Sequence, residues 1–248
     1  MNLKAIRDAM IIGKMKALPD LKRQPLVLVV IGILSAIPLF FFTVSGSGAM
    51  LSHGLIGALV STVGFIGINS AIQDIGQDRY VKIREMIVAM PVHPASYAIG
   101  VALAPLLLSL PGLAFFILVA VGTGILTAST LIWILPALLL CWSSLSAIGF
   151  IISTYLYKAS PYTLNNLANI LGIGLVFIPP VYYPAEMLGS LSWISYLIPT
   201  SNVAELVRGY VGLSGLPVET ATLRWLILGA TTIVFTALTA WKAKWREV

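Results

Sequence analysis

Long apolar stretches separated by short polar ones dominate the sequence. Stretches with at most one charged residue recur at about 25–44, 55–72, 97–121, 131–155, from 163 to the prolines at 179 and 180, and 223–241. An α-helix rises 1.5 Å per residue, so about 20 apolar residues cross the roughly 30 Å hydrocarbon core of a bilayer. The pattern therefore predicts an all-α integral membrane protein with six transmembrane helices, forming a single domain over residues 1–248.

The most polar internal stretch, residues 73–94, connects the second and third predicted spans. Its apolar side chains on one helical face are Tyr80, Ile83, Ile87 and Met90, and the opposite face carries Asp78, Lys82 and Glu85. Pro91 ends this pattern because proline cannot continue a helix. The pattern predicts a short amphipathic helix along the membrane surface, accessible to a protein outside the lipid. A solvated connector is the alternative.

Three other segments lie outside the spans. In residues 1–24, one helical face is apolar and consists of Leu3, Ile6, Met10, Gly13 and Ala17. This pattern predicts an interfacial helix on the cytoplasmic leaflet, and a disordered basic tail is the alternative. Residues 45–54 predict a flexible turn with a solvated His53. Residues 181–215 are apolar but too broken to span, which favours a re-entrant hairpin of two short half-helices in the outer leaflet. Within the second span, small residues at 57, 61, 64, 67 and 71 predict a helix-packing face.

Composition supports the membrane interpretation. Hydrophobic residues make up 58% of the chain and charged residues only 10%, against about 25% in a soluble domain. All but two of the 15 Lys and Arg residues fall on the side of the two termini, and the exceptions are Arg208 and Arg224. Basic residues collect on the cytoplasmic side, so both termini and residues 73–94 are predicted to be cytoplasmic in a multi-pass cell-membrane protein. The net charge of +6 therefore reflects topology, and no nucleic-acid partner is predicted.

No reactive constellation is apparent in the sequence. His53 and His93 fall on opposite sides of the predicted membrane, which argues against a zinc site, and Cys141 is predicted to be a small buried side chain. Neither a nucleophile elbow nor a phosphate-binding loop occurs, so no catalytic residue, no metal and no cofactor bound by this chain are predicted. The predicted span centres also lack the ionisable groups of ion-coupled carriers. Any energy source is therefore expected on another protein.

Two local stretches and the general layout resemble the membrane subunits of ABC exporters of the ABC-2 type. The first stretch runs from Arg84 to Val92 and is followed by Tyr97 and Gly100, although Met90 stands where family members often have threonine or serine. The second runs from Pro180 to Arg208. Its matching positions are Pro184, Glu186, Met187, Pro199, Thr200, Glu205 and Arg208.

The resemblance implies that residues 77–93 form a coupling helix seated on a separate cytoplasmic ABC ATP-binding subunit, which would hold ATP and magnesium. The implied contact residues are Tyr80, Lys82, Ile83, Arg84, Glu85, Ile87 and Met90. A second membrane subunit, identical or different, would complete a pathway for a hydrophobic or amphipathic compound such as a drug, a lipid or a polysaccharide chain.

The resemblance also places the hairpin at the external end of this pathway. The hairpin residues that it implies are Pro184, Glu186, Pro199, Glu205 and Arg208. Either Glu186, Glu205 and Arg208 pair with one another, or each faces lipid headgroups. The competing hypothesis is an ATPase-independent channel or assembly scaffold, and an intramembrane enzyme is a distant third.

Overall fold

The computed structural model describes residues 3–23, 36, 37, 40, 48–80 and 94–242. Every regular element within these ranges is helical, as predicted. The α-helices are α1 (Leu3–Arg23), α3 (Gly48–Tyr80), α5 (Pro94–Gly122), α6 (Ala128–Tyr155), α7 (Pro161–Phe177), α8 (Ile194–Leu197), α9 (Pro199–Tyr210) and α10 (Val218–Lys242), and η1 (Ala185–Leu191) is a 3₁₀ helix.

Four of these helices are long and apolar enough to cross a membrane, which marks the chain as a membrane protein. The four segments are Met50–Asp78 in α3, Ser96–Gly122 in α5, Ala128–Tyr155 in α6 and Val218–Trp241 in α10. They match the second, third, fourth and sixth predicted spans. The fifth corresponds to α7, whose 17 residues reach only about 26 Å. Most of the first, at 25–44, lies outside the described residues.

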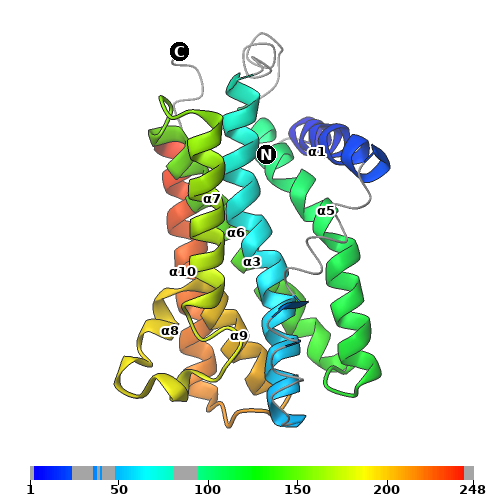
Figure 1. The fold of residues 1–248 in the computed structure, drawn as a ribbon, viewed down its shortest axis with the longest axis vertical. Coiled ribbons are helices and arrows are strands. Elements are labelled where there is room, and N and C mark those ends of the chain that lie inside the picture. Colours follow the sequence, from blue (N-terminus) through cyan, green and yellow to red (C-terminus); the bar gives the residue numbers. More distant parts are fainter. Residues whose placement is uncertain (1–2, 24–35, 38–39, 41–47, 81–93, 243–248) are drawn as a thin grey trace.

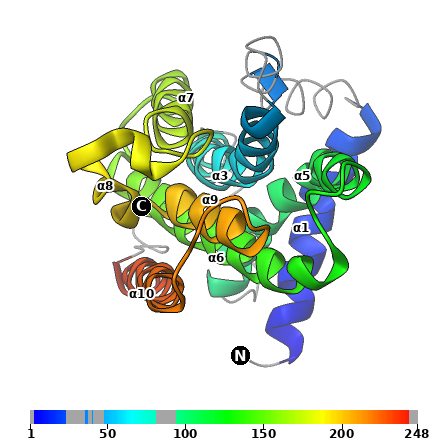
Figure 2. The ribbon, with the colours of Figure 1, turned by 90° about the horizontal axis from the view of Figure 1, so that it is seen from below.

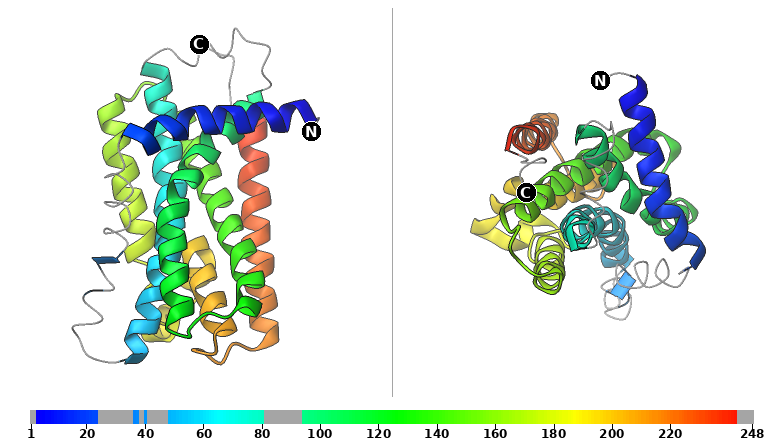
Figure 3. Two further views of the ribbon diagram at one scale, coloured as in Figure 1. Left: turned by 90° about the vertical axis from the view of Figure 1, so that its right-hand side faces the viewer. Right: turned by 90° about the horizontal axis from the view of Figure 1, so that it is seen from above.

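The long helices run side by side, with short elements across the two ends of the bundle. Figure 1 shows α1 at one end, together with the C-terminal ends of α3, α6 and α10. The view from the side shows that α1 lies crosswise to the long helices (Figure 3). We call this the α1 end. The opposite end, which we call the α9 end, carries η1, α8 and α9, and from below α9 lies over the ends of the long helices (Figure 2).

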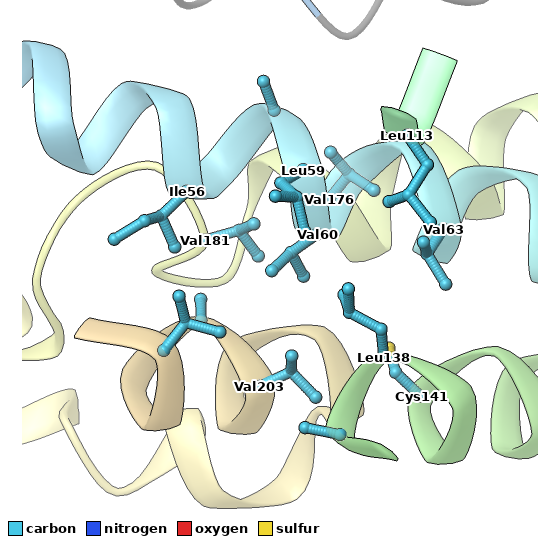
Figure 4. Packing of buried hydrophobic residues seen from close by; sticks show 14 of the residues in the cluster. Ile56, Leu59, Val60, Val63, Leu113, Leu138, Cys141, Val176, Val181 and Val203 are labelled. Atoms are coloured by element: carbon cyan, nitrogen blue, oxygen red, sulfur yellow. The ribbon is translucent and has the colours of Figure 1, made fainter. Parts of the chain in front are cut away.

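Helix α3 forms the centre of the bundle. Of its spanning segment, 89% is buried, against 17% for α10, which therefore lies at the edge. Aliphatic side chains of α3 such as Leu59 and Val63 pack against α6, α7 and α9 (Figure 4). The predicted small-residue face is confirmed: a Cβ at Gly67 would lie 3.2 Å from the Trp142 carbonyl oxygen of α6, which is tighter than an ordinary contact, so glycine favours this close approach.

Two helices in this bundle begin with side-chain caps. Thr127 accepts a hydrogen bond from the Thr130 backbone N–H, and the Thr130 hydroxyl in turn accepts from the Thr127 N–H, which forms a capping box at the start of α6. Ser160 caps α7 in the same position, and Pro161 follows at the first helical residue, where a missing N–H costs nothing.

The N-terminal segment is helical, and the face that it buries overlaps the predicted apolar face only in part, at Gly13 and Ala17. The buried residues of α1 include Ala9, Gly13 and Ala17, whereas Ile6 and Met10 are exposed. The reason is that α1 packs on another helix, α5, and a close helix crossing requires small side chains rather than large ones.

Three predicted boundaries also change. Helix α3 begins at Gly48, so most of the predicted turn at 45–54 is helical. The same helix continues to Tyr80, so residues 77–80 belong to the spanning helix and do not begin a new one. In the predicted hairpin, η1 and the single turn of α8 replace the first half-helix, and only the second half forms a longer helix, α9.

Candidate functional site

A buried carboxylate joins three helices at the α1 end. Asp78, near the end of α3, is only 3% exposed. Its Oδ2 accepts a hydrogen bond from Lys16 Nζ of α1 at 2.6 Å and another from the Tyr97 hydroxyl of α5 at 2.5 Å. A buried charge is stable only when it is paired and hydrogen-bonded, and this arrangement supplies both conditions. We call Lys16, Asp78 and Tyr97 the Asp78 junction.

A tight helix crossing brings Lys16 within reach of Asp78. At this crossing a Cβ on Gly100 of α5 would lie 2.7 Å from Ile12 Cβ and 2.9 Å from the Ala9 carbonyl oxygen of α1. From the other helix, a Cβ on Gly13 would lie 3.1 Å from Leu103 Cβ. The two backbones can approach this closely only because both residues are glycine, and α1 is therefore docked on α5 over several turns.

Only one of the predicted coupling residues, Tyr80, is described. Tyr80 ends α3 and is 74% exposed, so its ring does not pack on the bundle. The remaining ones lie outside the described residues: Lys82, Ile83, Arg84, Glu85, Ile87 and Met90. The solvated position predicted for Asp78 is wrong. Because α3 continues without a break, Asp78 shares the buried face of Ala71 and Ile75.

A second polar cluster surrounds Arg208 at the α9 end. Arg208 of α9 is fully buried, and its Nη1 donates to Glu205 Oε1 at 2.7 Å and to the Pro180 carbonyl at 3.1 Å. Its Nη2 donates to the Val181 carbonyl at 2.5 Å, and its Nε donates to His53 Nδ1 of α3 at 3.1 Å. Arg208 thus ties α9 both to α3 and to the segment that follows α7.

The carboxylate of Glu205 compensates the buried positive charge of Arg208. Burial lowers the pKa of Arg208, and the Glu205 carboxylate acts in the opposite direction. Glu205 Oε1 also accepts from the Ala185 backbone N–H at 2.9 Å. Because His53 accepts through Nδ1, its neutral ring carries the proton on Nε2. The solvated loop position predicted for His53 is therefore wrong: the ring is 9% exposed and lies inside the bundle end.

Arg224 fixes α10 to the same end. Its Nη1 donates to Asn202 Oδ1 of α9 at 3.2 Å, and its Nη2 donates to Ser195 Oγ of α8 at 3.1 Å. Its guanidinium lies 4.1 Å from the centre of the Tyr196 ring, within the range of a cation–π contact. We call Arg208 and Arg224 with these side-chain partners the arginine cluster.

The structure brings together only part of the predicted hairpin set. Glu205 and Arg208 pair, whereas Glu186 is exposed and forms no ion pair among the described residues. Pro184 precedes η1, and Pro199 starts α9 at its first helical position, where Pro is favoured. His53 and Arg224 were not predicted. For Arg224 a signal existed, because a cation within an apolar span needs a polar partner.

Neither cluster resembles a metal or catalytic centre. Within the described ranges, no group of three or more His, Cys, Asp or Glu side chains converges to hold a metal ion. Cys141 is buried in α6, as predicted. Lys16 and Asp78 pair across two helices, whereas Arg208 and Arg224 donate to neutral side chains of other helices, so both clusters join helices.

A scan against protein-family models and a search of curated proteins each found no match for this chain. Membership in the ABC-2 type therefore stays a prediction from the quoted residues.

Proposed function

We propose that this chain is the membrane subunit of an ATP-driven exporter of the ABC-2 type, powered by a separate cytoplasmic ATP-binding subunit. The observation that supports this function best is the Asp78 junction. It couples α1, α3 and α5 at the end where residues 81–93 connect α3 to α5. A force applied to that connection would act on two spanning helices together, with α1 as a brace.

The distribution of charge supports a cytoplasmic α1 end. Helix α1 exposes Lys4, Arg7, Lys14 and Lys22 there. The α9 end has Arg208 and Arg224, and both are buried among partners. Among the described residues, exposed basic side chains thus lie at the α1 end and the basic side chains of the α9 end are buried, which is the arrangement that the positive-inside rule predicts. Both termini would then face the cytoplasm.

The proposed topology has six spans and a re-entrant hairpin. Residues 25–44 would supply the first span and α7 the fifth. Helix α9 has 12 residues, about 18 Å, which is too short to cross, and its residues 199–208 are buried. Non-helical backbone at membrane depth is tolerated only where protein shields it, and the packing of α9 against α3, α6 and α10 provides such shielding. A second membrane subunit would complete the pathway for a hydrophobic or amphipathic compound.

The decisive experiment combines binding and coupling. Full-length chain is mixed with candidate ATP-binding subunits, and capture, ATP hydrolysis and transport are measured. Wild type should retain an ATPase, and the double variant Glu85→Arg with Arg84→Glu should release it. Asp78→Asn should retain the ATPase but lose transport, because the brace is weakened while the docking residues remain. Asp8→Asn, on the same end of the molecule, is the matched control and should behave as wild type.

Each outcome has a defined meaning. If no ATPase binds the wild-type chain, the exporter assignment is wrong and the channel or scaffold hypothesis replaces it. If an ATPase binds but Asp78→Asn transports normally, the chain is still an exporter subunit, and the coupling role of the Asp78 junction is wrong.

A further inference from the structure

A groove of about 550 Å³ lies on the outside of the bundle at the α9 end. Trp133 and Pro136 of α6 line one side, Ala221 and Trp225 of α10 line the other, and Tyr210 of α9 lies between them. The Trp133 and Tyr210 rings stack with their centres 5.9 Å apart. The groove therefore has aromatic walls and lies between α6 and α10, distinct from both the Asp78 junction and the arginine cluster.

The polar groups in the groove are few, and almost all are used internally. Trp225 Nε1 donates to the Tyr210 hydroxyl oxygen at 2.7 Å, and the Thr222 hydroxyl donates to the Val218 carbonyl at 2.8 Å. The Tyr210 hydroxyl proton is the exception, because no acceptor for it is found among the described residues. A ligand of this groove therefore meets an apolar surface and a single hydrogen-bond donor.

The depth of the groove limits what can fill it. Its α10 side runs from Val218, the first residue of the helix, to Trp225, a rise of about 10 Å. Both α6 and α10 are long and apolar enough to span, and little of α10 is buried, so the groove opens on a face that bilayer lipid can reach. Tryptophan and tyrosine at this depth are typical of the boundary between headgroups and acyl chains.

We propose that this groove is a binding site for a bilayer glycerolipid. The part of one acyl chain nearest the headgroup lies between Trp133 and Trp225. The ester carbonyl of that chain accepts a hydrogen bond from the Tyr210 hydroxyl. No charged side chain lines the groove, so the site selects for the ester-linked chain and not for headgroup charge. This inference requires only that the chain is a membrane protein, and it stands or falls independently of the proposed transport function.

The test maps lipid contacts on the full-length chain. The protein is reconstituted in phosphatidylcholine vesicles that contain a photo-activatable diazirine in the upper acyl chain, irradiated, digested and mapped by mass spectrometry. Cross-links should concentrate on the groove residues Ile132, Trp133, Ala221 and Trp225. They should exceed those on Phe115 and Leu118 of α5, which are exposed apolar residues outside the groove. Ala221→Trp fills the groove and should reduce its labelling several-fold. Leu226→Trp is the control, since Leu226 is exposed on the same helix outside the groove.

Tyr210→Phe tests the hydrogen bond without changing the ring. After washing, wild-type protein should retain about two- to tenfold more ester-linked than ether-linked phosphatidylcholine, which is the ratio expected for one neutral hydrogen bond. The variant should retain equal amounts of the two lipids. Labelling that is uniform over α5 and the groove would overturn the proposal. Labelling of the groove that is unchanged in Ala221→Trp would also overturn it. A change of oligomeric state in Ala221→Trp would show that a second copy of the chain occupies the groove, and this too would overturn the proposal.

Discussion

The α1 end and the α9 end both bury charged side chains, but they differ in how many contacts hold each charge. At the α9 end, Arg208 makes four hydrogen bonds to two side chains and two backbone carbonyls, and a second arginine adds contacts from α10. At the α1 end, one carboxylate oxygen of Asp78 accepts from Lys16 and Tyr97. The Lys16 side chain is also 24% exposed, whereas Arg208 is fully enclosed.

This difference indicates which end can move. Opening the α9 end would leave several buried polar groups without partners at once, and each costs about 1–3 kcal/mol. Separating α1 from α3 breaks one ion pair, after which Asp78 still accepts from Tyr97 and the partly exposed Lys16 can be hydrated. We infer that the α9 end is a fixed cap and that the α1 end is the adjustable one.

The largest expected effect comes from breaking the arginine cluster. Arg208→Met leaves Glu205 buried without its cation and should destabilise the protein by about 3–5 kcal/mol, seen as a loss of folded protein in thermal unfolding. Adding Glu205→Gln removes the stranded charge and should recover part of the stability. If the single variant unfolds at the wild-type temperature, the α9 end is not a fixed cap.

Local patterns in the sequence predicted the helices, but they did not predict which charged side chains are buried. The small-residue face of α3 repeats at helical spacing, so it is visible without a structure. Asp78 was misplaced because the helix continues through Gly76 to Tyr80, so the polar stretch does not begin a separate helix there. The contact between His53 and Arg208 joins residues 155 positions apart, and no local pattern encodes such a pair.

The helix crossing gives the next largest effect. In Gly100→Ala the new methyl group would meet Ile12 Cβ and the Ala9 carbonyl, neither of which is the flexible end of a side chain. We expect a loss of about 1–3 kcal/mol and easier tryptic cleavage within α1 as it leaves α5. Gly229→Ala is the control. No atom lies within 4 Å of its Cβ, so this substitution should be neutral or stabilising.

Asp78→Asn should affect stability over the same range as the helix-crossing variant. The amide retains an acceptor for the Tyr97 hydroxyl but loses the charge that holds Lys16, which predicts a loss of about 1–3 kcal/mol in thermal unfolding. Asp8→Asn is its counterpart in a longer and less buried ion pair, because Asp8 and Arg7 lie 4.0 Å apart with side chains that are 19% and 70% exposed. That variant should change stability by about 0.5 kcal/mol or less. Equal effects would mean that burial does not strengthen the Asp78 junction.

The smallest effect on stability is expected at Tyr80, and it separates folding from docking. The ring is 74% exposed at the end of α3, so Tyr80→Ala should leave the unfolding temperature within the range of ordinary surface substitutions, about 0.5 kcal/mol either way. An exposed aromatic ring at the α1 end contributes little to a monomer, but it is the kind of side chain that anchors a protein interface. If the adjustable end is where an ATP-binding subunit docks, Tyr80→Ala should weaken capture of that subunit without destabilising the chain. If the variant captures the ATP-binding subunit as well as wild type does, Tyr80 is not part of the docking surface.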